Sequence, residues 1–575
     1  MVARHRSFPA ARCRQVKGGL ARAALLVTLV TLASRVVGFG RWLAQGYFAG
    51  NGDFTDAFNA ANLLPNVLFE VAAGGALAGA VVPLVSGPLS RAAFTAEGTA
   101  ANRDQASRSA SALLGWTLVV LVPVAVLMAL LAGPVAGWLD LKDPALTQVA
   151  ASFLRVFAVQ VPVYGIAVVL GGILQAHKRF FWPAFAPLIS SLVVIGVYWG
   201  FAARAGRRGE QDVAELSAAA LDWLAWGVTA GVVALAVPLV IPALRTGLRL
   251  RPTLRFPAGE GRRAAHLAFA GVGALIAQQL ALVVVMKVGT DLGVYTTWLY
   301  AYNVWLLPYA VLAFPIATSA FPHFAEHAAA RRHHELAALV ASTTRILLVV
   351  AAAGAAALIA AAPAVETVFD VVVTGDAPGL AAALEWMAPG LLGYALVLHL
   401  SRALYAVDHG RAAVTATVAG WGVMALGLSG ARAWVVARGG AEPGVVLAAL
   451  GLAVTAGMAV AGVALIVAVR RHLGRAALAG LGNVVLALAV GTTAGAFAGH
   501  MVAYLLQPDG WKIDPLFRVG ADGERAFVLG DLLIALGGGL AGGLVAAGVV
   551  VGVALLATPD LRARLRDLKR GGTAG

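Results

Sequence analysis

The amino-acid sequence predicts an all-α integral membrane protein with about 14 transmembrane helices. The chain of 575 residues is 60% hydrophobic and only 12% charged, and apolar runs of roughly 20 residues or more recur along its whole length. A helix needs about 20 apolar residues to cross about 30 Å of hydrocarbon. The sequence lacks the alternating segments of about ten residues that form transmembrane barrels, so we expect a helical bundle.

The charged residues predict how the helices are oriented. Lys and Arg gather in the tails and in alternate loops, which together hold 28 of the 43 such residues, and the opposite loops hold far fewer. Because positively charged loops tend to stay in the cytoplasm, this asymmetry predicts an even number of spans and two cytoplasmic termini. Basic segments beside anionic membrane lipids explain the net charge of +15 without nucleic acid as a partner.

The apolar runs divide the chain into two lobes of six helices and a final pair. After a basic cytoplasmic tail (1–22), the N-lobe (23–243) holds predicted spans at 23–49, 57–87, 110–138, 147–176, 182–203 and 217–243. A cytoplasmic linker (244–264) precedes the C-lobe (265–470), with predicted spans at 265–289, 295–324, 338–362, 380–407, 412–437 and 443–469. Spans at 477–506 and 528–557 form the C-terminal pair (471–557), and a basic cytoplasmic tail (558–575) follows.

The first apolar run is predicted to be a retained transmembrane helix. It is too long and too charged for the core of a signal peptide, and no cleavage site is evident. The single cysteine, Cys13, lies in the basic tail before it. We therefore expect no disulfide and no cysteine-rich metal site. We also expect no other metal site and no cofactor.

A weak internal repeat supports the division into two lobes. The segment NLLP at 62–65 is similar to WLLP at 305–308, and each is followed by a second apolar stretch that ends in proline. Duplicated six-helix bundles are a transporter architecture, in which the substrate is held between the lobes and access alternates by rocking. The pattern therefore favours a transporter.

Three charged residues near the start of the chain are the strongest candidates for a binding site. Arg35, Arg41 and Asp56 lie in or beside the first two apolar segments. A charge at this depth costs several kcal/mol unless it faces protein or a water-filled cavity. Two arginines and one carboxylate indicate an anion site in which Asp56 pairs with an arginine, although the arginines could also snorkel to an interface.

Five segments together resemble one known family. At SRVVGFGR (34–41), TDAFNAANLLPN (55–66), GGILQAHKRFFWPAFAPL (171–188), LPYAVLAFPIATSAFPHFAEHAA (307–329) and GLLGYALVLHLSRALYAVDHGR (390–411) the chain is similar to the MurJ/MviN family of lipid II flippases. That family belongs to the multidrug and oligosaccharidyl-lipid exporter superfamily. The resemblance covers both lobes in order and the two C-terminal helices.

The resemblance implies both an activity and a location. It implies a V-shaped pair of lobes around a cationic cavity in the bacterial plasma membrane, and outward translocation of the undecaprenyl-pyrophosphate-linked peptidoglycan precursor. The chain would be a transporter and not an enzyme, with membrane lipids and cell-wall synthesis proteins as partners. The last two helices would form a groove for the polyprenyl tail.

The resemblance also assigns site residues and shows two departures. The first-helix arginines of the family correspond to Arg35 and Arg41, and the second-helix aspartate to Asp56. The family often has an arginine where this chain has Phe69, and its eighth-helix arginine corresponds to Asn303. Cations elsewhere could restore positive potential to the cavity, namely Lys287, Arg402, Arg155 and Arg432.

Other functions stay open at this level. One alternative is an exporter of another polyprenyl-linked oligosaccharide, and a second is a degenerate relative that serves as a non-transporting scaffold. A drug antiporter should have acidic helices, and a membrane-embedded glycosyltransferase should expose a pair of carboxylates or histidines in a loop. The sequence offers neither pattern clearly.

Overall fold

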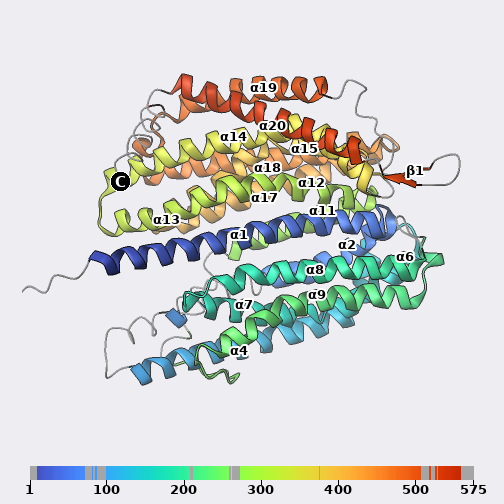
Figure 1. Cartoon of the computed structure of the whole chain (residues 1–575), viewed down its shortest axis with the longest axis horizontal. Helices are drawn as coiled ribbons and strands as arrows, with labels where there is room; N and C mark the ends of the chain where they lie inside the picture. Colours follow the sequence, from blue (N-terminus) through green and yellow to red (C-terminus); the bar gives the residue numbers. More distant parts are fainter. Residues whose placement is uncertain are drawn as a thin grey trace, which may run out of the picture.

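The computed structural model is a bundle of long, roughly parallel helices (Figure 1). It describes residues 10–71, 99–206, 212–257, 272–373, 376–506 and 529–558, together with a few short pieces at 81, 84–86, 261, 517–519, 525–527 and 562. Within these residues, twelve helices are long and apolar enough to cross a membrane, and one bent pair makes a thirteenth. This confirms the predicted fold class.

Two halves of the chain occupy different sides of the bundle, and α1, which belongs to the first half, lies where the two halves meet (Figure 1). The first half contains α1 (Ala10–Ala49), α2 (Asp53–Phe69), α4 (Thr99–Leu130), α5 (Ala132–Leu139), α6 (Pro144–Phe157), α7 (Gln160–Ala176), α8 (Phe181–Ala205), the short 3₁₀ helix η2 (Val213–Glu215) and α9 (Ala218–Leu244). We call these elements the N-half. Helix α1 packs along α8, and α8 packs along α9.

The remaining elements form the C-half. They are α11 (Val272–Asp291), α12 (Tyr295–Pro308), the π-helical turn η3 (Tyr309–Ala313), α13 (Phe314–Ala329), α14 (His333–Val372), α15 (Leu380–Met387), α16 (Gly390–Ala406), α17 (Gly410–Ala437), α18 (Pro443–His472), the 3₁₀ turn η4 (Arg475–Leu478), α19 (Leu481–Leu505), β1 (Phe517–Val519), β2 (Arg525–Phe527) and α20 (Leu529–Ala557). The two short strands pair antiparallel. Helices α19 and α20 pack on each other and on α14.

The predicted spans match these helices except in two places. The span at 265–289 is described only from Val272, where α11 begins. The second predicted span, 57–87, begins with α2, whose 17 residues are too few to count as a full span, and residues 72–80, 82–83 and 87 lie outside the described part of the chain. Residues 1–9 of the predicted N-terminal tail and most of the predicted C-terminal tail also lie outside it, whereas residues 10–22 belong to α1. Residues 73–76, where the chain has AGGA and the family it resembles usually has AEGA, lie outside it too. The total of fourteen therefore stays a prediction.

Local sequence signals explain where several helices begin and end. Asp143 accepts a hydrogen bond from the N–H of Ala145 before α6, and Ser217 accepts one from Ala220 before α9, which are N-cap contacts. Helix α8 is followed by Gly206, which has a φ of 74°, a left-handed conformation that glycine adopts without strain.

The tenth predicted span is bent by 50° between α15 and α16. Pro389 stands at the break and has no N–H to continue the helical ladder. The carbonyls freed there are used by neighbours, because Thr455 donates to Trp386 and the Trp305 indole donates to Met387 at 2.7 Å. Two carbonyls at the break are therefore hydrogen-bonded to α12 and α18.

Candidate functional site

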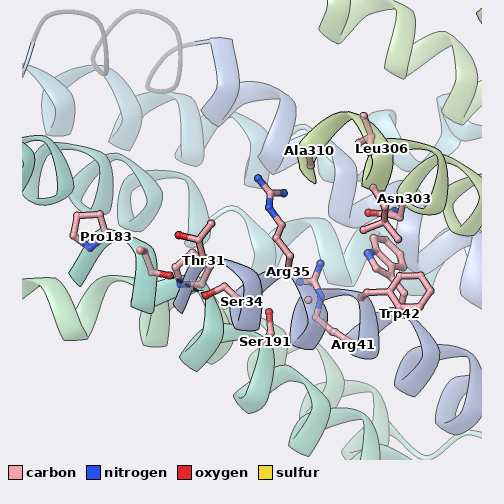
Figure 2. A pocket seen from close by; sticks show the side chains of 15 residues that line it. Thr31, Ser34, Arg35, Arg41, Trp42, Pro183, Ser191, Asn303, Leu306 and Ala310 are labelled. Carbon is pink, nitrogen blue, oxygen red and sulfur yellow. Dashed lines mark hydrogen bonds between the residues drawn. The ribbon is translucent and has the colours of Figure 1, made fainter. Parts of the chain in front are cut away.

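A cavity of about 460 Å³ lies between the two halves (Figure 2). Its walls come from α1 and α8 on one side and from α12 and η3 on the other, and its volume is in the range of ligand sites. The lining residues are Thr31, Ser34, Arg35, Gly38, Phe39, Arg41, Trp42, Pro183, Ala184, Pro187, Ser191, Asn303, Leu306, Leu307 and Ala310. The only charged side chains among them are the two arginines of α1.

Arg35 and Arg41 bring positive charge to the cavity without a neutralising partner. Within the described parts of the chain, no carboxylate lies within ion-pair distance of either guanidinium. The Arg41 guanidinium lies 5.4 Å from the ring centre of Trp42. Guanidinium stays charged and binds phosphate or carboxylate oxygens with paired, charge-assisted hydrogen bonds. The cavity therefore suits an anionic ligand.

Asp56 does not lie in this cavity, which corrects the expectation that it pairs with an arginine. Its side chain is buried and accepts hydrogen bonds from the backbone N–H of Thr296 at 2.7 Å and of Tyr295 at 3.2 Å. Helix α12 has Val294 at its N-cap and no side-chain cap of its own. Asp56 caps α12 from the opposite half, because free N–H groups at a helix N-terminus attract a carboxylate.

Further hydrogen bonds join the halves beside Asp56. Asn51 donates to the Thr297 hydroxyl at 3.0 Å and to the Asp376 carbonyl at 2.7 Å, and Asn59 donates to the Thr296 hydroxyl at 3.0 Å. We call the contacts of Asn51, Asp56 and Asn59 with the first turn of α12 the closing layer. It lies where α1 ends at Ala49, so the halves are closed together at that end of the bundle.

Lys287 was expected in the cavity, and the structure places it elsewhere. Its Nζ donates to the Leu139 carbonyl at 2.8 Å and lies 3.8 Å from the Asp140 carboxylate. A cation at the C-terminus of α5 is favourable because carbonyls are unpaired there. Lys287 therefore joins α11 to α5 and adds a further contact between the halves.

The other predicted cations are also outside the cavity. Arg402 on α16 lies 5.7 Å from the ring centre of Phe321 and does not line the cavity. Arg432 on α17 forms an ion pair with Asp291 at 2.6 Å. Asn303 is in the cavity wall as expected, so of the six predicted site residues the structure brings together Arg35, Arg41 and Asn303.

Three lining hydroxyls were missed from the sequence, those of Thr31, Ser34 and Ser191. Thr31 lies one turn before Arg35 on α1, because residues three or four apart are neighbours on a helix, and Ser34 directly precedes Arg35. That spacing was the available signal for the two residues of α1. None of the three is charged, however, so none stands out in an apolar segment.

A helical membrane bundle with a cationic cavity between two halves defines a membrane transporter as the class of protein. The particular family is shown by its sequence pattern. The pattern described as lipid II flippase MurJ matches residues 46–508, and the chain belongs to this family.

Individual relatives align over shorter segments. A probable lipid II flippase MurJ of Rhizobium meliloti (strain 1021) is 32% identical over 232 residues, which are 39% of this chain and 40% of that protein. Lipid II flippase MurJ of Burkholderia cenocepacia is 31% identical over 177 residues, 31% of this chain and 33% of that protein. The aligned segments thus span 40% or less of these curated relatives.

Solved structures show the same fold at low identity. A lipid II flippase MurJ in an inward closed conformation has a TM-score of 0.65 at 16% identity, covering 93% of this chain and 99% of that chain. An inward-facing multidrug resistance MATE family transporter of the MOP superfamily has a TM-score of 0.59 at 15% identity, covering 80% and 99%.

Proposed function

We propose that this protein moves lipid II, the undecaprenyl-pyrophosphate-linked peptidoglycan precursor, from the cytoplasmic to the outer leaflet of the bacterial plasma membrane. The observation that carries the proposal is the pair of arginines, Arg35 and Arg41, in a cavity between the two halves of a MurJ-family chain whose described lining holds no other charged side chain. A pyrophosphate supplies the negative charge that these side chains lack, while the polyprenyl tail stays in the surrounding lipid.

The charge distribution supports an orientation for this activity. If basic loops are cytoplasmic, both termini lie in the cytoplasm and the closing layer lies at the outer surface. The structure then represents a state closed to the outside, with the arginines accessible from the inner side. Alternating access would require the closing layer to break as the inner side closes.

The moving parts are proposed to be the two lobes. We place the N-lobe at 23–243 and the C-lobe at 265–470, with a cytoplasmic linker at 244–264 and the helix pair at 471–557 after the C-lobe. The activity would be transport without covalent chemistry. The exported precursor would then pass to cell-wall synthesis proteins.

The proposal is tested by asking whether this gene rescues bacteria depleted of their own lipid II flippase. We expect growth and normal lipid II export when the chain is expressed, with export measured as the fraction of lipid II accessible to an external enzyme. Cells that express inserted protein at normal levels and still retain lipid II inside would contradict the proposed substrate.

A further inference from the structure

Asn303 is the one polar side chain that the C-half contributes to the described lining of the cavity. Its Nδ2 donates a hydrogen bond to the carbonyl of Leu299, one turn earlier on α12, at 2.8 Å. A carbonyl only accepts hydrogen bonds, so the amide nitrogen must face the helix. The Oδ1 of Asn303 is therefore left toward the cavity, where it acts as a hydrogen-bond acceptor.

Two of the hydroxyls on the opposite wall, those of Thr31 and Ser34, also offer hydrogen-bond acceptors to the cavity. Thr31 donates its hydroxyl proton to the carbonyl of Val27, and Ser34 donates to the carbonyl of Ala184, both at 2.8 Å. A hydroxyl has one proton and two lone pairs. Both side chains therefore present lone pairs to a ligand, like Asn303.

The acceptors flank the arginines instead of mixing with them. In Figure 2, Thr31 and Ser34 lie on one side of Arg35, and Asn303 lies on the other side beside Trp42. An ionised pyrophosphate carries no hydrogen to donate, so an acceptor near it contributes repulsion. Hydroxyl and amide N–H groups of a carbohydrate or peptide match these acceptors, because each unmatched polar group would lose a hydrogen bond to water.

Resting on the proposed function, we propose that Asn303 is a specificity residue for the head group. Its Oδ1 accepts a hydrogen bond from an O–H or N–H of the carbohydrate-peptide part of the substrate, while Arg35 and Arg41 bind the pyrophosphate. The C-half thus recognises the head group, and the N-half binds the negatively charged pyrophosphate.

The test compares two lipids that share the pyrophosphate and differ in the head group. Full-length protein in nanodiscs is titrated with undecaprenyl pyrophosphate and with lipid II. Asn303→Leu should weaken lipid II binding about fivefold, the effect of one neutral hydrogen bond, and leave undecaprenyl pyrophosphate binding within twofold. Asn66→Leu is the matched control, because Asn66 makes the same contact one turn back, to Asn62 at 2.8 Å, outside the cavity lining.

Asn303→Arg keeps the test valid if the leucine variant folds poorly. A third cation should tighten undecaprenyl pyrophosphate binding severalfold and tighten lipid II binding less, because lipid II gains the same attraction but loses the acceptor for its head group. A misfolded protein cannot bind either lipid more tightly. The inference is overturned if Asn303→Leu weakens both lipids equally with its fold intact, if it changes neither, or if Asn303→Arg tightens both lipids equally. Wild-type protein that binds neither lipid would instead refute the proposed function itself.

Discussion

Arg35 and Arg41 present two guanidinium groups to the cavity, and among the residues that the structure describes no carboxylate pairs with them. We expect Arg35→Ala and Arg41→Ala each to abolish lipid II export while the protein stays folded and inserted. Lysine at either position should restore only part of the activity, because an ammonium cannot form the paired hydrogen bonds of a guanidinium. Complementation of flippase-depleted cells, with membrane expression measured in parallel, checks both results.

Arg438→Ala is the matched control for these variants. Arg438 lies at the end of α17, 4.2 Å from the ring centre of Trp434, and does not line the cavity. Its loss should leave complementation unchanged. Normal growth with both cavity-arginine variants at wild-type expression would show that the anion site is assigned wrongly.

Asp56 and Asp53 lie on the same helix and offer a matched pair of substitutions. Asp56→Asn should lower the Tm of the purified protein, because hydrogen bonds to a charged group contribute about 1.5–3 kcal/mol and the buried carboxylate accepts two of them from α12. Asp53 pairs with Lys142 at 3.0 Å while both side chains are half exposed or more, and such pairs contribute about 0–1 kcal/mol. Asp53→Asn should therefore leave Tm nearly unchanged.

Equal shifts in Tm for the two variants would mean that the closing layer does not depend on the Asp56 charge. Opening of the closing layer gives a second measurement, because a weaker layer should open more readily. Accessibility to an external thiol reagent of a cysteine introduced at Leu292, which lies just before α12 and is not one of the closing-layer residues, should rise in Asp56→Asn and stay constant in Asp53→Asn.

At the scale of single residues, the sequence could predict which charges are costly and not which groups satisfy them. Arg35 and Arg41 were found because charge in an apolar segment is rare. Asp56 was found in the same way, but its partners are backbone N–H groups at 295 and 296, which look alike in any sequence. The partner of Lys287 is likewise a backbone group, a carbonyl, which the sequence does not mark. Only the fold shows which helix end lies next to which side chain.

Among the helices, α19 and α20 depend on glycine for their close approach. A Cβ on Gly542 would lie 2.5 Å from the carbonyl oxygen of Gly499, whereas a Cβ on Gly548, in the same helix, would have no atom within 4 Å. Small residues let membrane helices pack backbone to backbone. We expect Gly542→Ala to lower Tm by several degrees and Gly548→Ala to leave it unchanged, measured on purified protein.

The two glycine variants also test whether this helix pair matters to transport. If α19 and α20 lie outside the transport pathway, Gly542→Ala should reduce stability more than export. A Gly542→Ala protein with unchanged Tm would show that the helices can separate slightly at no cost.

At the scale of elements, apolar length predicted the helices well and their interruptions poorly. The span expected at 147–176 begins earlier, at Pro144, and consists of α6 and α7. The span expected at 295–324 includes the π-helical turn η3 after Pro308. Such breaks depend on tertiary partners, as Thr455 and Trp305 show at the bend before α16, and hydropathy does not report them.

For the whole molecule, the sign of the transported charge predicts how export is driven. A pyrophosphate that leaves a cytoplasm with negative potential moves down the electrical gradient, at about 2.3 kcal/mol per elementary charge and 100 mV. If the arginines neutralise the pyrophosphate in transit, the empty carrier returns with positive charge instead, and the same potential drives its resetting. We therefore expect export to stop when the membrane potential is collapsed.

Vesicles whose potential is set by a potassium gradient and valinomycin allow this measurement. Removing ATP while the potential is held should have no effect, because the sequence contains no nucleotide-binding motif. Export that continues at zero potential with a proton or sodium gradient present would contradict electrical driving and indicate ion coupling. Glu70 and Asp531 would then be the first residues to substitute.

The closing layer lies at one end of the bundle, so a small tilt of α1 is enough to displace the contacts there. The membrane-spanning part of α1, Leu26–Ala49, has 24 residues and is about 36 Å long at about 1.5 Å per residue. A tilt of about 10° around the middle of this span therefore moves each end by about 3 Å, by the same helix length. A hydrogen bond does not survive a separation of about 3 Å beyond its normal length, so the small tilt that narrows the Leu26 end is enough to break the closing layer at the Ala49 end.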